Sequence, residues 1–518
     1  MTNEITYTIE KTKEGTDTII IEKDGKQIPL HSKYFPSKES ESLKFDFNPK
    51  KYDLLIVIGV GLGYHLLPLK KLSSYYSKII FIDILSDLFS LLQNSEKTSF
   101  LTSFNESLFL FGKEPAEISA SLYKAIDLSS TKGISILEHP QSLRAFSEYY
   151  NEVKEVINSI INKKAGNKAT LKAFGSLYIR NILKNINFMN NHKSIDTLFN
   201  KFHGFPACVI TSGPSLEIAL DHLKKQQHTI FIIAVDSAFS LLQKSGITPD
   251  FVISIDPQGY IMEHFQGTIQ NDTKYIFSIS SFSSLLDKYQ GYISLNTHPL
   301  SQLIETSLER KIKSIESHSG TVAGDAIAFA KACGFSSIGL LAFDFSFINY
   351  SIYAKGTAYQ RRYSNIFQKR TLSVETQNMN YIRKSSKGFQ YNQKPTRKSF
   401  IQYKESIEQM LNTIGSENIY NINKNGIPIN GITTQELQKF IKLNDNNINK
   451  REIIDSVTKE DVKMSDLFSL KKFKNYLQKK EIIDELITAS LGEKADKRSI
   501  KRCREMIKKM GRAKREER

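Results

Sequence analysis

Short apolar runs recur along this chain, and segments with helical spacing separate them. Runs of about four to eight apolar residues that end at Gly, Pro or Asp are typical of strands covered on both faces of a parallel sheet. Apolar residues three and four positions apart follow several of these runs and predict helices. This alternation indicates an α/β fold. The predicted strands cover residues 54–58, 79–84, 132–137, 207–211, 229–235, 251–255, 274–278, 291–295 and 337–341.

The same pattern divides the chain into four parts. Residues 1–145 predict a small antiparallel element, with a hairpin turn at Asp24-Gly25, followed by a Rossmann-like domain. Residues 146–202 predict a linker of two long helices with breaks at Gly166 and Gly175. Residues 203–432 predict a central doubly wound α/β domain, and residues 433–518 predict a helical, basic C-terminal domain.

Composition narrows the class of protein. The three cysteines, Cys208, Cys333 and Cys503, lie far apart and form no metal-ligand pair, and the N-terminus shows no signal peptide. No apolar run is long enough to predict a membrane span. We therefore expect a cytoplasmic protein. The net charge of +17 gathers partly in residues 471–518, which predict a solvated basic tail, and no nucleic-acid-binding motif accompanies it.

The central domain opens on a strand that ends in Ser212-Gly213-Pro214-Ser215 and then enters a helix. Gly213 allows a ligand to approach the backbone closely, and Ser215 is predicted to cap the helix with its hydroxyl. The amides and the dipole at a helix N-terminus favour a bound phosphate. The turn therefore predicts a site for an anionic ligand.

Carboxylates end the next two predicted strands, at Asp236 and Asp256. Because strand carboxyl ends meet at one edge of an open α/β sheet, we expect Asp236, Asp256 and Ser215 to share one site. An isolated Asp after a strand is often only a helix cap, but two beside an anion-binding turn favour a functional site.

A second glycine-rich turn lies in the N-terminal domain. Gly59, Gly61 and Gly63 follow the first strand, and Asp83 ends the second. This is the arrangement of nucleotide-binding turns in doubly wound sheets, in which the carboxylate holds a ribose. The alternative is a Rossmann-like domain that keeps this shape and binds nothing.

Further candidate residues follow in the central domain. Ser319-Gly320-Thr321 forms a small-residue turn before an alanine-rich helix, again suited to an anion or a ribose. Asp344 follows the strand at 337–341, and a loop then carries Tyr353 and Lys355. Lys355 adds a positive charge or is simply solvated.

Taken together, these motifs resemble the motility accessory factor glycosyltransferases. The resemblance covers most of residues 30–432 and implies transfer of a nonulosonic acid, of the pseudaminic or legionaminic type, from a CMP-activated sugar to serines and threonines of flagellin, before export from the cytoplasm. It implies a central domain of glycosyltransferase-like fold. The motifs that carry it are Leu30-His31-Ser32, Lys38-Glu39, Gly59-Val60-Gly61-Leu62-Gly63, the block 206–357 and Asn423-Lys424-Asn425-Gly426-Ile427-Pro428-Ile429-Asn430-Gly431.

The central block also resembles, more distantly, bacterial sialyltransferases that use CMP-sialic acid. That resemblance implies that Gly213-Pro214-Ser215 and Ser319-Gly320-Thr321 contact the nucleotide, and that Tyr353, after Asp344-Phe345, steadies the departing phosphate. The sialyltransferases carry asparagines where this chain has Asp236 and Asp256. They also carry a histidine base in a loop that corresponds to 393–399, where this chain has none. Asp236 or Asp256 would then act as base or hold a divalent metal ion.

Two other functions stay open at this point. The central block is similar to an archaeal pterin diphosphokinase, which would release AMP from ATP. A flagellin-binding protein without catalysis would also carry these motifs.

Overall fold

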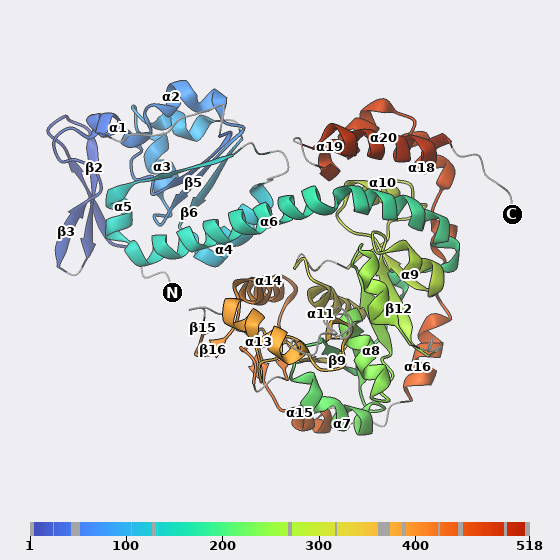
Figure 1. Cartoon of the computed structure of the whole chain (residues 1–518). Helices are drawn as coiled ribbons and strands as arrows, with labels where there is room; N and C mark the ends of the chain where they lie inside the picture. The colour runs from blue at the N-terminus through green and yellow to red at the C-terminus, as the bar shows by residue number, and fades with distance from the viewer. Residues whose placement is uncertain are drawn as a thin grey trace. The chain divides into compact units, whose positions relative to one another are not determined.

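The computed structural model describes residues 5–23, 25–42, 52–104, 106–126, 131, 133–267, 272–315, 317, 319–360, 373–385, 390–422, 425–443, 449–491 and 495–512. The chain forms two compact units, Met1–Lys172 and Ala173–Arg518, and the division falls within one long helix (Figure 1). The mixed α/β fold expected from the hydrophobic pattern is confirmed.

The first unit is built around a parallel sheet with strand order β6-β5-β4-β7. All five residues of β4 are buried, because apolar clusters cover both faces of the sheet. A separate antiparallel sheet, β1-β2-β3, precedes it, and Gly25 lies at its predicted hairpin while Asp24 lies outside the described residues. The strands are β1 (Tyr7–Lys11), β2 (Asp17–Lys23), β3 (Lys26–Pro29), β4 (Leu54–Ile58), β5 (Lys78–Asp83), β6 (Ser107–Phe111) and β7 (Ile134–Glu138).

The helices of this unit are short before the long linker. The 3₁₀ turn η2 ends at Leu66, and α2 begins after Pro68, which has no amide to continue the first turn. The helical elements are η1 (Pro36–Lys38), α1 (Glu39–Ser42), η2 (Tyr64–Leu66), α2 (Leu69–Leu72), η3 (Ser73–Tyr75), α3 (Leu88–Gln93), η4 (Ser99–Ser103), α4 (Pro115–Ala125) and α5 (Pro140–Ala145).

The linker is one continuous helix, α6 (Ser147–Asn185), of 39 residues. The prediction of two helices that break at Gly166 and Gly175 is wrong. A glycine in a helix costs only about 1 kcal/mol relative to alanine, and no proline lies in this segment to remove a hydrogen bond.

The second unit is built around a nine-stranded parallel sheet with order β18-β17-β14-β9-β10-β11-β12-β13-β8. From β9 the chain proceeds to β13 in one direction, and it then returns to the other side of β9 as β14. The strand order therefore reverses between β9 and β14. The strands are β8 (Lys193–Ser194), β9 (Pro206–Ile210), β10 (Phe231–Val235), β11 (Phe251–Ser254), β12 (Lys274–Ser278), β13 (Gly291–Ser294), β14 (Ser337–Leu341), β17 (Ile419–Asn421) and β18 (Thr433–Thr434), and a separate hairpin pairs β15 (Gln390–Tyr391) with β16 (Lys394–Pro395).

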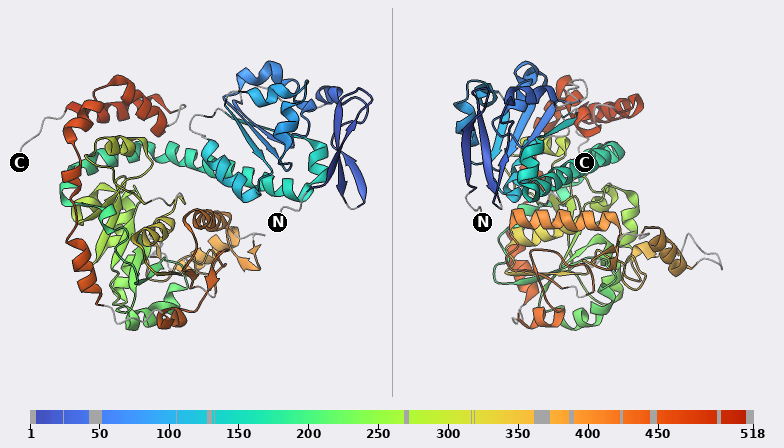
Figure 2. Two further views of the ribbon diagram at one scale, coloured as in Figure 1. Left: turned by 180° about the vertical axis from the view of Figure 1, so that it is seen from behind. Right: turned by 90° about the vertical axis from the view of Figure 1, so that its left-hand side faces the viewer.

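Helices cover both faces of this sheet, and the C-terminal part is helical as expected. The C-terminal helices are red in Figure 2; among them α19 and α20 contact each other, and both contribute buried residues to the large core. The helical elements are η5 (Ile186–Asn191), η6 (Ile195–Leu198), α7 (Leu216–Gln226), α8 (Asp236–Lys244), η7 (Gly259–Phe265), α9 (Ser283–Lys288), α10 (Pro299–Thr306), α11 (Val322–Cys333), α13 (Val374–Ser385), α14 (Lys398–Ile414), α15 (Leu437–Leu443), α16 (Lys450–Thr458), α17 (Met464–Leu467), α18 (Leu470–Tyr476), α19 (Lys480–Leu491) and α20 (Lys497–Arg512).

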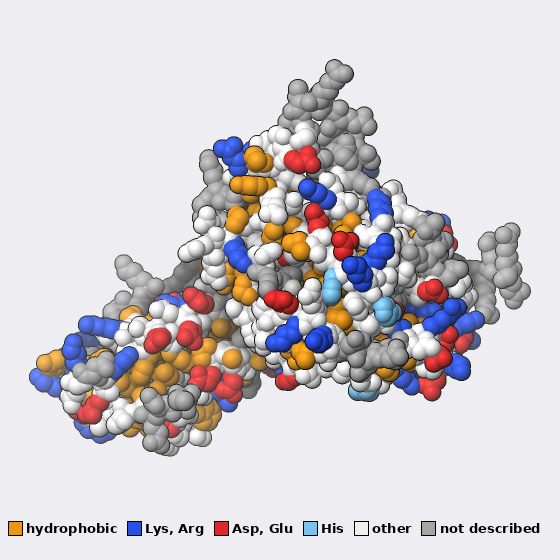
Figure 3. Space-filling model, turned by 90° about the horizontal axis from the view of Figure 1, so that it is seen from below, with side chains coloured by type: hydrophobic (Ala, Val, Ile, Leu, Met, Phe, Trp, Pro, Cys, Tyr) orange, Lys and Arg blue, Asp and Glu red, His pale blue; other side chains and the backbone are white. Residues whose placement is uncertain are grey.

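The surface charge is mixed where it can be seen. On the face drawn in Figure 3, basic and acidic side chains are interspersed. This arrangement differs from the continuous basic stripe that marks a nucleic-acid-binding surface. Among the described residues, no helix combines the length and apolar character needed to cross a bilayer.

Candidate functional site

The candidate site lies where the strand order of the large sheet reverses. Parallel strands β9 and β14 are direct neighbours, with Ile210 opposite Leu341. After β9 the chain continues to β10, toward one edge of the sheet, and after β14 it continues to β17, toward the other edge. In open α/β sheets, this reversal point is where ligands bind. The turn after β9 and the loop after β14 are therefore the first places to search for functional groups.

A carboxylate joins these two segments. Asp344 lies after β14, and its Oδ1 accepts the hydroxyl of Ser215 at 2.6 Å while its Oδ2 accepts the Ser215 amide at 2.8 Å. The predicted cap at Ser215 is wrong, because its hydroxyl bonds to no amide of α7. Burial raises the pKa of Asp344, and both bonds from Ser215 oppose that rise.

Gly213 is the residue that permits this approach. A Cβ atom at this position would lie 2.1 Å from the carbonyl oxygen of Ala342 and 2.5 Å from Oδ2 of Asp344. The β14 loop is itself strained, since Ala342 and Phe345 have φ values of 64° and 50°. Left-handed backbone at non-glycine residues costs of order 1–3 kcal/mol and concentrates at functional sites.

The turn retains donors for an anion. The amides of Leu216 and Glu217 bond to the carbonyls of Gly213 and Pro214, so the first turn of α7 is closed on itself. The amides of Ser212 and Gly213 donate to no acceptor within the described part of the chain. The amides of this turn that could still bind an anion therefore precede Pro214.

Asp236 lies at the start of α8, beside this turn. The Ser212 hydroxyl is 2.9 Å from that of Ser237. Oδ1 of Asp236 lies 3.3 Å from Nδ1 of His264, and both side chains are buried. His264 comes from η7, which packs on α8. This histidine–carboxylate pair was missed in the sequence, because an isolated histidine in an irregular segment carries no periodic signal.

Asp256 and the tyrosines complete the same cluster. Tyr260 donates its hydroxyl to Oδ2 of Asp256 at 2.5 Å. Burial raises the pKa of Tyr359, and the charges of Tyr353, Tyr260, Asp236 and Asp256 raise it further. The ring of His264 lies 5.2 Å from that of Tyr359 and 6.1 Å from that of Tyr260, between centroids. Through these contacts Asp236, Asp256 and Tyr353 belong to one cluster.

Tyr353 stacks on Tyr359, with ring centroids 4.2 Å apart and planes inclined by 10°. Burial raises the pKa of Tyr353, while the charge and a hydrogen bond of Arg397 lower it. Arg397 belongs to the loop 393–399, where the sialyltransferases have their histidine. Arg397 was missed in the sequence, because the resemblance to the sialyltransferases predicts a base in this loop and an arginine is a cation.

The remaining predicted site residues lie outside the cluster around His264 and Tyr359. Lys355 is exposed, and its amide donates to Glu217 at 2.7 Å. The hydroxyl of Thr321 accepts the amide of Gly324 at 3.1 Å, so Ser319-Gly320-Thr321 caps α11. A helix that precedes a parallel strand begins at the carboxyl edge, so this turn lies at the same edge of the sheet. Within the turn, the hydroxyls of Ser319 and Thr321 lie 3.2 Å from each other.

In the second glycine-rich turn, which lies in the first unit, backbone amides donate hydrogen bonds to the carboxylate of Asp83. Oδ2 of Asp83 accepts the amides of Val60 at 2.6 Å and Gly61 at 3.0 Å, and its Oδ1 accepts that of Leu85 at 3.0 Å. Burial raises the pKa of Asp83, and these amides oppose that rise. The carboxylate predicted to hold a ribose therefore holds the turn.

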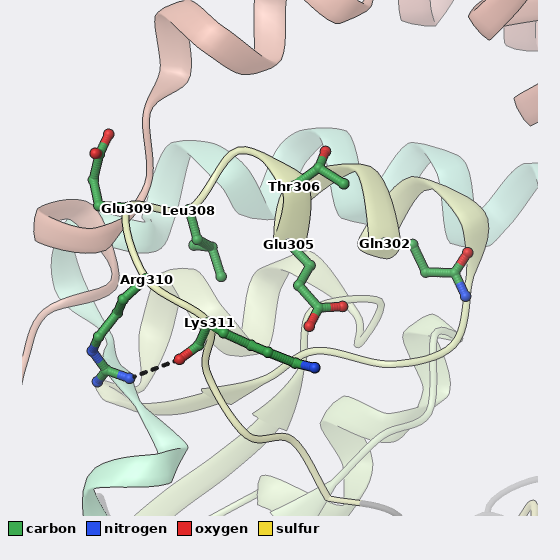
Figure 4. Close-up of a pocket in the computed structure, with 7 residues that line it drawn as sticks. All are labelled: Gln302, Glu305, Thr306, Leu308, Glu309, Arg310 and Lys311. Carbon is green, nitrogen blue, oxygen red and sulfur yellow. Dashed lines mark hydrogen bonds between the residues drawn. The ribbon is translucent and has the colours of Figure 1, made fainter.

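An open pocket of about 490 Å³ lies elsewhere, at the end of α10 (Figure 4). Its lining mixes charges of both signs and includes none of the predicted site residues. Arg310 turns toward Asp196, with 2.6 Å between Nη1 and Oδ2. We assign the site to the reversal point, because the chemically useful groups converge there. The pocket is lined by Gln302, Glu305, Thr306, Leu308, Glu309, Arg310 and Lys311.

One family model matches the part of the chain that carries this candidate site. The family model described as 6-hydroxymethylpterin diphosphokinase MptE-like matches residues 180–350. That stretch runs from the end of α6 to the β14 loop, and it includes Ser215, Asp236, Asp256 and Asp344.

Two uncharacterized proteins of Treponema pallidum (strain Nichols) are similar to parts of the chain. One is 30% identical over 138 residues, which are 26% of this chain and 24% of that protein. The other is 35% identical over 85 residues, which are 16% of this chain and 40% of that protein. The chain thus spans less than half the length of either relative.

The structure of the MAf glycosyltransferase from Magnetospirillum magneticum AMB-1 is similar over nearly the whole chain. The TM-score is 0.58 at 14% identity, and the match covers 98% of this chain and 87% of the other. Over both of its units, this chain therefore has the fold of the MAf glycosyltransferase.

Proposed function

We propose that this protein is a glycosyltransferase that transfers a nonulosonic acid from a CMP-activated sugar to serines or threonines of flagellin. One observation carries the proposal: Asp236, Asp256 and Tyr353 are joined through the rings of His264, Tyr260 and Tyr359 in one cluster, beside the turn that follows β9. The fold shared with the MAf glycosyltransferase supports it. The sugar type, the donor and the acceptor come from the sequence resemblance.

Breaking the bond between the sugar and the CMP phosphate leaves positive charge on the sugar and a dianionic leaving group. Groups aimed at the developing charge contribute most to such a reaction. Tyr353 would donate its hydroxyl to the departing phosphate, and Arg397 beside it would supply positive charge. The amides of Ser212 and Gly213 would bind the same phosphate.

The acceptor hydroxyl must lose a proton as it attacks. The Asp236–His264 pair is suited to this step, because the carboxylate holds Nδ1 and leaves Nε2 as the nitrogen that takes the proton. This pair would replace the histidine that the loop 393–399 lacks. Asp256, held by Tyr260, would stabilise the positive sugar. A divalent ion bound by Asp236 or Asp256 stays a prediction.

The test uses purified full-length protein, flagellin and a CMP-nonulosonate. Intact-mass analysis of flagellin should show added sugar masses, and peptide mapping should place them on serine or threonine. Paired controls omit the donor or replace Asp236 by Asn. The proposal fails if flagellin gains no mass with either the pseudaminic or the legionaminic donor while the protein is folded by circular dichroism.

A pterin-type diphosphokinase is a second candidate, favoured by the family model over residues 180–350. It would use the same anion-binding turn for a diphosphate. Release of AMP from ATP that depends on a hydroxymethylpterin would support it. Absence of AMP release, together with modified flagellin, would exclude it. A non-catalytic flagellin-binding protein would bind flagellin and show neither reaction.

A further inference from the structure

Four metal-ligating side chains meet inside the first unit, whereas the proposed glycosyltransferase site belongs to the second unit. His31 follows β3, Glu39 begins α1, His65 lies in η2 and His139 follows β7. One ligand atom from each lies within 4.8 Å of all the others. We call these four residues the histidine cluster. Among the described residues, this is the one group of three or more His, Cys, Asp or Glu side chains that could share a metal ion.

The hydrogen bonds of His31 give it a positioning role. Its Nε2 accepts the amide of Leu62 at 2.8 Å, so its Nδ1 carries the proton and donates to Oε2 of Glu39 at 2.7 Å. Oε1 of Glu39 accepts the amide of Ser32 at 2.7 Å. Both oxygens of Glu39 are thus oriented.

His139 has one ring nitrogen oriented and one directed at Glu39. Its Nδ1 lies 2.7 Å from the hydroxyl of Ser142, and its Nε2 lies 3.9 Å from Oε2 of Glu39. A histidine ligand typically has its second nitrogen held in this way by a neighbouring polar group.

His65 is the residue of the histidine cluster whose ring nitrogens are not oriented by hydrogen bonds of good geometry within the described residues. Its side chain is fully buried, and neither ring nitrogen has a hydrogen-bonding partner of good geometry among the described residues. The ring stacks on that of His139, with centroids 4.3 Å apart and planes inclined by 13°. Burial of a polar group without a partner costs roughly 1–3 kcal/mol, so His65 is the member of the cluster that the protein's own hydrogen bonds explain least.

The glycine-rich turn makes room for these rings. A Cβ atom at Gly61 would lie 2.4 Å from Nε2 of His31. One at Gly59 would lie 2.7 Å from Cβ of Ser142 and 3.1 Å from Cβ of His139. The turn that suggested a nucleotide in the sequence is therefore shaped by the histidine cluster.

We propose that His65, His139 and Glu39 bind one divalent transition-metal ion of the Zn²⁺ type, with His31 and Ser142 as positioning residues. Two imidazoles and a carboxylate are a common Zn²⁺ set and leave a further position open.

The ion would connect segments that no strand pairing connects. Glu39 comes from the region after the antiparallel sheet, whereas His65 and His139 follow β4 and β7 of the parallel sheet. Zn–N bonds of about 2.1 Å set ligand atoms roughly 3.4 Å apart, so the side chains close slightly around the ion. The site would thus fix the N-terminal segment to the sheet, independently of the glycosyltransferase reaction.

The experiment uses the full-length protein, stripped with a chelator and shown to be folded by circular dichroism. Calorimetric titration with ZnCl₂ should give one tight equivalent, and Co²⁺ should give visible absorption typical of nitrogen and oxygen ligands. His65→Gln and His139→Gln should each abolish this equivalent. Ser142→Ala should weaken Zn²⁺ binding roughly 10–100-fold. His203→Gln, at an exposed histidine of the second unit, is the matched control and should bind as wild type.

The proposal is overturned if stripped, folded wild-type protein binds neither ion, which requires no variant to fold. It is also overturned if His65→Gln and His139→Gln bind Zn²⁺ with unchanged stoichiometry and affinity. Neither result depends on donor, acceptor or activity, so failure here leaves the proposed glycosyltransferase function intact.

Discussion

The carboxylate of Asp344 accepts two hydrogen bonds from Ser215, one from the Ser215 hydroxyl at 2.6 Å and one from the Ser215 amide at 2.8 Å. These residues are 129 positions apart in the chain, yet they join the two loops at which the sheet order reverses. The same carboxylate lies against Gly213, which has no side chain to obstruct it. The contact fixes the shape of the turn before any ligand arrives.

We expect Asp344→Ala to destabilise the protein by about 1–3 kcal/mol, because the hydroxyl and amide of Ser215 would lose a charged acceptor while buried. Urea unfolding followed by far-UV circular dichroism measures this, since the chain has no tryptophan. Asp287→Ala, at an exposed position of α9, is the matched control. Equal unfolding midpoints for the two variants would remove the structural role assigned to Asp344.

Tyr353→Phe should lower kcat about a hundredfold and leave KM for the donor nearly unchanged, because a donor aimed at developing charge acts mainly in the transition state. Initial rates of sugar transfer to flagellin measure this. Tyr350→Phe makes the same change on a ring that is 67% exposed, and it should keep the wild-type rate. A full rate for Tyr353→Phe would rule out its role at the phosphate.

His264→Gln should lower the transfer rate by about 10²–10⁴-fold if His264 is the general base. Gln retains a polar side chain of similar length but cannot take the proton. His228→Gln, at an exposed histidine, serves as the control. If His264→Gln transfers sugar at the rate of the control, the base must be sought at Asp236 or Asp256.

Asp325, in the first turn of α11, makes stability depend on pH. Burial raises its pKa from 3.8 to about 6, although a hydrogen bond from Ser317 opposes the rise. Between these values the folded state binds more protons than the unfolded state, so the free energy of unfolding falls as pH rises through this window. Above about pH 6 the charged carboxylate costs up to about 3 kcal/mol.

Asp325→Asn removes that charge and keeps an acceptor for Ser317. It should therefore raise the melting temperature at pH 8 and change it little near pH 4, as measured by calorimetry at both pH values. Asp287→Asn, at an exposed aspartate, should shift neither. A shift of equal size at both pH values would show that the effect of Asp325→Asn is not electrostatic.

The strands were the most predictable part of this protein. The runs at 54–58, 274–278 and 337–341 coincide with β4, β12 and β14, because a strand buried on both faces must be apolar throughout. Helix ends were harder. Gly166 and Gly175 did not break α6, since glycine weakens a helix only slightly.

The sequence identified several residues of the candidate site, but it predicted their hydrogen-bonding partners less well. Asp236 and Asp256 were identified from their positions after strands, and Tyr353 from the resemblance to the sialyltransferases. Contacts through His264, Tyr260 and Tyr359 join them in one cluster. The Ser215 hydroxyl was assigned to its own helix, but it donates to Asp344. His264 and Arg397 were missed, because neither lies at a strand end or within a recurring pattern.

The sequence alone determined the alternation of strands and helices, the glycine turns and the carboxylates that end strands, because these depend on neighbours along the chain. Only the tertiary structure decided which groups fill each turn. Asp344 closes the turn at Gly213, Asp83 closes that at Gly61, and His31 occupies the space beside it. The reason is that a hydrogen bond depends on separation in space, and strand order in a sheet sets that separation independently of distance along the chain.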